Sequence, residues 1–252
     1  MKRLLITLAA TTAFTASSQA ALIAFGDFSG DARFANGNSL AFSSANQGWE
    51  AKNFTWGSGS STTQTFSNEQ ATVGSNYGRG VASAFSPIAG QTGTDNFQLS
   101  FDWTAPDSAV GDSLSVTYQI LGFKINEGAT PDAADKFFNA INGRDYKPGN
   151  LGGLATWTNL LDGSSGSNTS ATAFGTFTGT AGVLGTAAID LNLGGVNMED
   201  FDYIAVKFNA GVDGSEVVSG GILDNVAINV PEPSVAVLSA LGALGLIRRR
   251  RR

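Results

Sequence analysis

Three stretches of the chain alternate large apolar residues with polar ones, which is typical of strands with one buried face. Residues 97–103 put four large apolar side chains on one face and three polar ones on the other, and residues 114–120 and 204–208 repeat the pattern. Near Leu121 the alternation slips before Phe123, which predicts a β-bulge. Weaker alternation between clusters of turn-forming residues predicts further strands at residues 22–25, 39–42, 53–56, 81–85, 156–160, 173–178, 187–193 and 222–230.

One segment has a helical period instead. Thr130 is a suitable N-cap, Pro131 fits the first helical position, and three apolar residues follow at helical spacing. We therefore expect one short helix over residues 131–142, within a long connection between strands. About eleven strands and a single short helix predict an all-β fold, in which two antiparallel sheets pack as a β-sandwich of the jelly-roll type.

The end of the chain has a different pattern. Pro231 and Pro233 fix their own φ angles and keep the backbone extended. Residues 235–247 carry no charge, and as a helix they would rise about 20 Å, less than the roughly 30 Å of a hydrocarbon core. The arginines at 248–252 favour the cytoplasmic side of a membrane. The pattern predicts a C-terminal segment that enters the membrane from inside and is held there by arginine.

This tail resembles the PEP-CTERM sorting signal, in which a Pro-Glu-Pro motif, a short hydrophobic helix and an arginine cluster follow one another. The matching motif is Pro231, Glu232 and Pro233, and the resemblance covers residues 231–252 only. It implies an exported protein of a Gram-negative-type bacterium, transiently anchored in the inner membrane and handled by an exosortase, a membrane-embedded cysteine transpeptidase. It also implies a final place at the cell surface or in the extracellular matrix of a biofilm. Catalysis in this scheme belongs to the exosortase, and the three motif residues are its substrate.

The N-terminus independently predicts export. Lys2 and Arg3 precede an apolar stretch at residues 4–16, and small residues occupy the −3 and −1 positions of a signal peptidase site that ends at Ala20. We expect cleavage after Ala20, with Ala21 as the alternative. The chain thus divides into a signal peptide, a β-sandwich domain and a sorting signal, at residues 1–20, 21–230 and 231–252.

Composition narrows the function classes. Seven of the 15 basic residues and one of the 21 acidic residues lie in the end segments, which leaves 8 against 20 and a net charge of −12 between them. Such a field repels a phosphate backbone, so nucleic-acid binding is disfavoured. The chain has no Cys and no His, which excludes disulfides, thiol nucleophiles, Ser-His-Asp triads and the usual zinc or copper sites. Catalysis would have to use carboxylates, and no catalytic residue is assigned.

The last predicted strand resembles the closing strand of lectin-like and carbohydrate-binding jelly rolls, where an aspartate precedes alternating apolar residues. Asp224 has the strand parity of Ile222, Val226 and Ile228, so we expect it to point toward the apolar face, where an unpaired carboxylate is costly. The resemblance implies a structural Ca²⁺ shared with the first strand, for which Asp27 is the natural partner. Calcium takes six to eight oxygens, so two aspartates do not complete a site. The alternative is an Asp224 that is exposed or bonded to turn amides.

Two further groups of residues are candidates for glycan chemistry. Glu199, Asp200 and Asp202 form the densest acidic cluster, but they lie among turn residues and are better interpreted as a solvated loop than as the paired carboxylates of a glycosidase. Trp49, Trp56 and Trp157 lie in weakly apolar, Gly/Ser-flanked surroundings. Exposed aromatic faces stack on sugar rings, so these three are candidate glycan contacts, with ordinary packing as the alternative.

Three hypotheses for the function follow. The first is a non-enzymatic cell-surface or matrix protein, processed by signal peptidase and exosortase and associated with exopolysaccharide. The alternative is a carbohydrate-binding module in the same place, with calcium as a structural ion. A carboxylate-based glycan hydrolase or lyase is the third.

Overall fold

A computed structural model describes the chain at residues 26–28, 48–51, 65–67, 70–73, 81–85, 97–107, 114–130, 153–167, 173–210 and 220–229. All of them lie between the two end segments. The strands predicted at residues 22–25, 39–42 and 53–56, the helix predicted at 131–142, the signal peptide and the sorting signal lie outside the described residues. No helix in the described part of the chain is long and apolar enough to cross a membrane.

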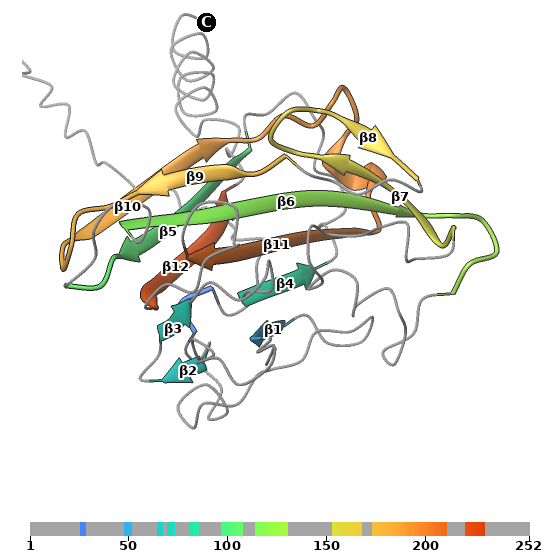
Figure 1. The fold of residues 1–252 in the computed structure, drawn as a ribbon. Helices are drawn as coiled ribbons and strands as arrows, with labels where there is room; N and C mark the ends of the chain where they lie inside the picture. Colours follow the sequence, from blue (N-terminus) through green and yellow to red (C-terminus); the bar gives the residue numbers. More distant parts are fainter. Residues whose placement is uncertain are drawn as a thin grey trace, which may run out of the picture. The chain divides into compact units, whose positions relative to one another are not determined.

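The described residues form two antiparallel sheets (Figure 1). The five-stranded sheet has the order β10 (Leu184–Asp190), β5 (Gln98–Thr104), β12 (Gly221–Asn229), β3 (Gln70–Val73) and β2 (Thr65–Ser67). The seven-stranded sheet has the order β1 (Gly48–Ala51), β4 (Val81–Phe85), β11 (Tyr203–Ala210), β6 (Ser115–Ile125), β7 (Ala155–Asn159) and β8 (Ser165–Gly166). Its seventh strand, β9 (Gly175–Thr178), pairs with the first half of β6, while β7 pairs with the second half.

The chain order of these strands confirms the predicted jelly roll. From β3 to β6 and again from β9 to β12, successive strands alternate between the two sheets. Without the β7–β8 hairpin, the central strands have the orders β10-β5-β12-β3 and β4-β11-β6-β9, which are the two four-stranded sheets of a jelly roll. The all-β sandwich expected from alternation is therefore the observed fold.

The core lies between the sheets and is rich in aromatic rings. Phe101 of β5 lies 5.0 Å from the ring of Phe208 on β11, edge to face, and 5.6 Å from the ring of Tyr118 on β6. Trp103 is fully buried, and its indole nitrogen donates a 3.0 Å hydrogen bond to the Leu114 carbonyl. Edge-to-face pairs and a satisfied indole N–H are how large aromatic side chains are buried without a polar penalty.

The bulge predicted near Leu121 is absent from the β6–β11 ladder. The two strands pair without a register shift from Tyr203↔Phe123 to Ala210↔Val116. The slip in alternation has another cause: β6 is buried on both faces, so apolar residues occupy both parities, and Leu121 and Phe123 belong to a second cluster on the outer face. A glycine lies between them at 122 because a Cβ there would come within 2.6 Å of the Phe201 ring.

A bulge does occur in β12. The register against β5 shifts between Asp224 and Ala227, and Asn225 takes a positive φ of 49°. The extra residue reverses the parity of the strand, so that Leu223 and then Val226 are buried. The expected orientation of Asp224 toward the apolar face is therefore wrong, because Asp224 lies on the outer face with its register partner Asp102.

Candidate functional site

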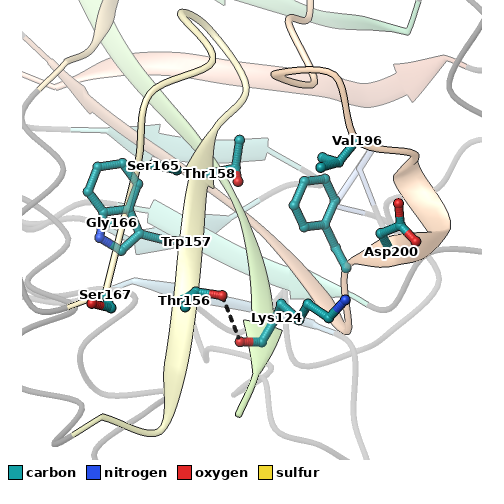
Figure 2. Close-up of a pocket in the computed structure, with 10 residues that line it drawn as sticks. Lys124, Thr156, Trp157, Thr158, Ser165, Gly166, Ser167, Val196 and Asp200 are labelled. Atoms are coloured by element: carbon teal, nitrogen blue, oxygen red, sulfur yellow. Dashed lines mark hydrogen bonds between the residues drawn. The ribbon is translucent and has the colours of Figure 1, made fainter.

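A cleft of about 500 Å³ lies beside the β7–β8 hairpin (Figure 2). Three separate segments of the chain line it: the end of β6, the hairpin itself, and the connection that precedes β11. The lining residues are Lys124, Thr156, Trp157, Thr158, Ser165, Gly166, Ser167, Val196, Asp200 and Phe201. The volume is in the range of small-molecule sites in proteins, about 300–1,000 Å³.

Two threonines of β7 place hydroxyl groups in the cleft. Thr156 and Thr158 share one face of the strand because side chains alternate, and they are opposite Lys124 and Gly122 of β6 in the register. The hydroxyl of Thr156 donates a long hydrogen bond of 3.5 Å to the Lys124 carbonyl (Figure 2). The Lys124 side chain is exposed, so its ammonium group is accessible to a ligand.

The opposite wall comes from the connection before β11. Met198–Asp200 forms a 3₁₀ turn, and the Asp200 carboxylate accepts a 3.0 Å hydrogen bond from the backbone nitrogen of Asn197 as part of a capping box. The side chains of Val196 and Asp200 lie across the cleft from Thr156 and Thr158 (Figure 2). The capping box therefore holds this wall of the cleft in one conformation.

The acidic cluster at residues 199–202 is divided by this geometry. Glu199 and Asp200 are exposed on the 3₁₀ turn, as a solvated loop predicts. Asp202 instead accepts a 2.7 Å hydrogen bond from the backbone nitrogen of Ile125, which ties the connection to the end of β6. Asp200 is the single carboxylate among the described residues that line the cleft.

Burial, and then the neighbouring Asp202 carboxylate, raise the pKa of Tyr203 at the start of β11.

The three candidate tryptophans have different positions. Trp49 is fully buried in the core, 5.0 Å from the ring of Phe28, so it has no face for a sugar and is a packing residue. Trp56 lies outside the described residues. Trp157 lines the cleft, but its side chain is 5% exposed and lies on the face of β7 opposite Thr156, where it packs with the second apolar cluster. Figure 2 shows its indole on the other side of β7 from Val196.

Asp27 and Asp224, the two residues predicted to bind calcium, lie near one another, but the described residues around them do not form a metal site. The backbone nitrogen of Val226 donates a 2.7 Å hydrogen bond to the Gly26 carbonyl, which brings the first described segment, including Asp27, to the bulge of β12. Burial, and then the carboxylates of Asp102 and Asp27, raise the pKa of Asp224, against hydrogen bonds from the Asn225 backbone and the Gln70 side chain that lower it.

The carboxylate oxygens of Asp102 and Asp224 already accept hydrogen bonds from other groups of the protein. Asp102 accepts from the Thr186 hydroxyl at 2.6 Å and from the Asn225 amide at 2.8 Å, and Asp224 accepts from the Asn225 backbone at 2.7 Å. Within the described ranges, no group of three or more acidic side chains is arranged to hold a metal. A calcium ion at Asp27 and Asp224 stays a prediction.

Most of the cleft could not be identified from the sequence. Trp157 is the one lining residue that the sequence marks as a candidate ligand contact, because an exposed indole could stack on a sugar ring, and Asp200 belongs to the acidic cluster. The hydroxyls of Ser165 and Ser167 lie in a Gly/Ser stretch typical of flexible loops, which here contains the short strand β8. The one available signal was the Thr-Trp-Thr alternation, which gives a β-strand with two adjacent hydroxyls on one face.

Comparisons with known proteins assign neither a family nor an activity to the chain. No family model matches the chain, and no curated protein matches it significantly. Among solved structures, an arabinose-bound α-L-arabinofuranosidase is similar at 14% identity and a TM-score of 0.38, over 84% of this chain and 26% of that one. The chain thus spans about a quarter of the enzyme. A xylan-binding module is similar at 15% identity and a TM-score of 0.29, over 77% of this chain and 97% of that one. Both scores are too low to transfer a site or an activity.

Proposed function

We propose that this protein is a carbohydrate-binding β-sandwich that works outside the cytoplasm, with the cleft beside β7 as its glycan site. The observation that carries the proposal is the polar lining of that cleft. Four hydroxyl side chains, one ammonium and one carboxylate converge there, beside the apolar surfaces of Val196 and Phe201. Sugars present hydroxyls that donate and accept hydrogen bonds next to apolar C–H faces, and this lining offers both kinds of contact.

The lining favours binding over hydrolysis. A glycosidase that works through paired carboxylates needs two of them on either side of the scissile bond. The described lining supplies Asp200, and one oxygen of that carboxylate already accepts from the Asn197 backbone. The buried Trp157 offers no open ring for stacking, so we assign affinity to hydrogen bonds and charge, which favours substituted or acidic glycans that can contact Lys124.

A binding experiment tests the site. The full chain is applied to a glycan array that includes the producing cell's own exopolysaccharide. Replacing both threonines, Thr156→Val with Thr158→Val, keeps the side-chain shape and removes two hydroxyls, so we expect affinity to fall about tenfold. Thr72→Val, on the outer face of β3, is the matched control and is expected to bind as wild type. If the wild type binds no glycan, or if the double threonine variant binds as tightly as Thr72→Val, the proposed site is wrong.

The place of action rests on the two ends of the chain. We assign Met1–Ala20 as a signal peptide and Pro231, Glu232 and Pro233 as the motif that an exosortase reads, supported by the order and spacing of the three parts of the tail. Intact mass of the protein recovered from its native cell is the test. We expect a species that lacks residues 1–20 and is found outside the cytoplasm. A cytosolic species with both Met1 and Arg252 in place would contradict this assignment, whatever the outcome for glycan binding.

A further inference from the structure

Strand β10 is a long edge of the five-stranded sheet. Among the described residues it pairs with β5 alone, over all seven of its positions. The backbone nitrogen of Leu191 donates a 2.8 Å hydrogen bond to the Phe97 carbonyl, one position beyond the end of the ladder. Hydrogen-bonded positions recur at every second residue of an antiparallel pair, so the odd-numbered residues of β10 bond β5. The backbone N–H and C=O groups of the even-numbered ones face the free edge, and these are Leu184, Thr186, Ala188 and Asp190.

This edge lacks the features that usually prevent pairing. Edge strands are commonly protected by lysine, proline, a bulge or very short length. β10 has seven residues, no proline and no lysine, and its pairing with β5 has no register shift. Its one charge, Asp190, accepts a 3.0 Å hydrogen bond from the Gln98 side chain.

Exposed apolar side chains occur at the start of β10 and at the start of the neighbouring strand β9. Leu184 is 63% exposed, Val183 53% and Phe174 42%, and they make up most of the large exposed hydrophobic residues in the described part of the chain. Phe174 comes directly before β9 and Val183 directly before β10. These two strands are neighbours across the sandwich, because a Cβ on Gly185 would lie 3.2 Å from the ring of Phe177 (Figure 1). Apolar residues beside an open edge are a mark of an interaction surface.

We propose that β10 pairs antiparallel with β10 of a second copy of this chain, about a two-fold axis at Ala187. In this register Leu184 is opposite Asp190 of the second copy, and Thr186 is opposite Ala188 of the second copy. All the even-numbered residues then form hydrogen-bonded pairs, about eight bonds in total. The two five-stranded sheets join into one continuous sheet, and the contact is the same on both copies, as a two-fold interface requires.

Charge and side-chain size favour this partner. The two Asp190 carboxylates lie six strand positions apart, about 20 Å, which is beyond the Debye length at physiological salt. Ala187 meets its own copy at a position that is not hydrogen-bonded, where opposite side chains are closest. Its side chain is small and is buried on the core side of β10, so the two copies of residue 187 meet without a clash or a buried charge.

Single cysteines test the register directly, because the chain has no cysteine of its own. The full chain carrying Ala187→Cys is oxidised with copper–phenanthroline in intact cells and run on a non-reducing gel. We expect a disulfide-linked dimer as the main product. Leu184→Cys is the control: it is more exposed, but the register holds the two copies of residue 184 about 20 Å apart. A dimer at least fivefold weaker with Leu184→Cys supports the register, and equal or stronger cross-linking with Leu184→Cys overturns it.

A second pair of variants separates pairing from folding. Ala188→Pro removes an N–H that faces the free edge and leaves the ladder to β5 intact, whereas Ala188→Ser keeps that N–H. We expect Ala188→Pro, in the Ala187→Cys background, to reduce the cross-linked dimer at least tenfold, and Ala188→Ser to leave it unchanged. Resistance to proteolysis checks that each variant is folded. A folded Ala188→Pro variant that still cross-links fully, or an Ala187→Cys variant that is folded and stays monomeric, contradicts the proposal.

Discussion

The outer faces of the two sheets differ sharply. On the five-stranded sheet, β5 alternates strictly between partly exposed polar residues and buried apolar ones. On the seven-stranded sheet, β6 is buried without a break from Ser115 to Phe123, and β11 from Ile204 to Ala210. The first sheet therefore has one buried face, and the second has two.

The second buried face is itself divided. One end is an apolar cluster that includes Leu121, Phe123 and Trp157, with small residues of β4 and β11 beside them. The other end is polar: Gln119 and Asn159 both donate side-chain hydrogen bonds to the Ala173 carbonyl, at 3.3 and 3.2 Å. The burial pattern of a strand therefore depends on its sheet: alternation marks a sheet with one face toward solvent, and continuous burial marks a sheet that is covered on both faces.

The largest expected effect comes from the second apolar cluster. Phe123→Ala removes a ring that is 1% exposed on the outer face of β6. The lost burial and the remaining cavity should lower the free energy of unfolding by about 3–5 kcal/mol. The measurement is chemical unfolding followed by tryptophan fluorescence.

Thr104→Ala gives the matched change on the outer face of the five-stranded sheet. Thr104 is only partly buried, and we expect the free energy of unfolding to change by less than about 0.5 kcal/mol. Similar losses from Phe123→Ala and Thr104→Ala would show that the two outer faces do not differ in their contribution to stability.

The same difference explains which parts of the fold the sequence predicts. β5 alternates, and its predicted position at 97–103 is one residue from the observed Gln98–Thr104. β6 is longer than its predicted range, and the sequence pattern wrongly predicts a bulge in it, because burial of both faces looks like a slip in a one-face pattern. The strands β1, β2, β3 and β8 have two to four residues each, too few to show a period, and were missed.

The candidate site was harder to predict for a different reason. The cleft brings Lys124, Thr158 and Asp200 together from three segments that are far apart in the sequence. They are joined by the pairing of β6 with β7 and β11, and by hydrogen bonds such as the one from Ile125 to Asp202. Nothing local in the sequence marks a threonine as part of a cleft. The Gly/Ser-flanked surroundings of Trp49 look exposed in the sequence, but its ring packs against Phe28 in the core, as the packing alternative predicts.

An intermediate effect is expected at Gly122, where the covered sheet meets the cleft. Gly122→Ala places a Cβ within 2.6 Å of the Phe201 ring, so that the ring or β6 must move. We expect a loss of about 1–3 kcal/mol in the free energy of unfolding, as for other overpacked sites, together with weaker glycan binding, since Phe201 lines the cleft. Adding Phe201→Leu should restore part of the stability. If the single variant is as stable as wild type, Phe201 does not pack rigidly on β6.

The smallest effect concerns Asp224, on the outer face of the five-stranded sheet. Burial raises its pKa above the ordinary 3.8, so between these two values the folded state binds more protons than the unfolded state. The free energy of unfolding therefore falls as the pH rises from about 3.8 through the folded-state pKa. Asp224→Asn removes this fall: we expect equal stability near pH 3.5 and, because the group is partly solvated, a gain of less than about 1 kcal/mol for the variant at pH 7.

Thermal unfolding at the two pH values measures the change, with Glu127→Gln on an exposed turn as the control for a lost surface charge. The same samples test calcium. If Asp27 and Asp224 hold the ion, millimolar Ca²⁺ raises the melting temperature of the wild type, and Asp224→Asn abolishes that rise and lowers stability instead of increasing it, because the ion's binding energy is lost with its ligand. The opposite result has two parts: Asp224→Asn gains stability at pH 7, and Ca²⁺ does not change the melting temperature of the wild type. That result would show that Asp224 belongs to the sheet surface alone and would exclude an ion at the bulge.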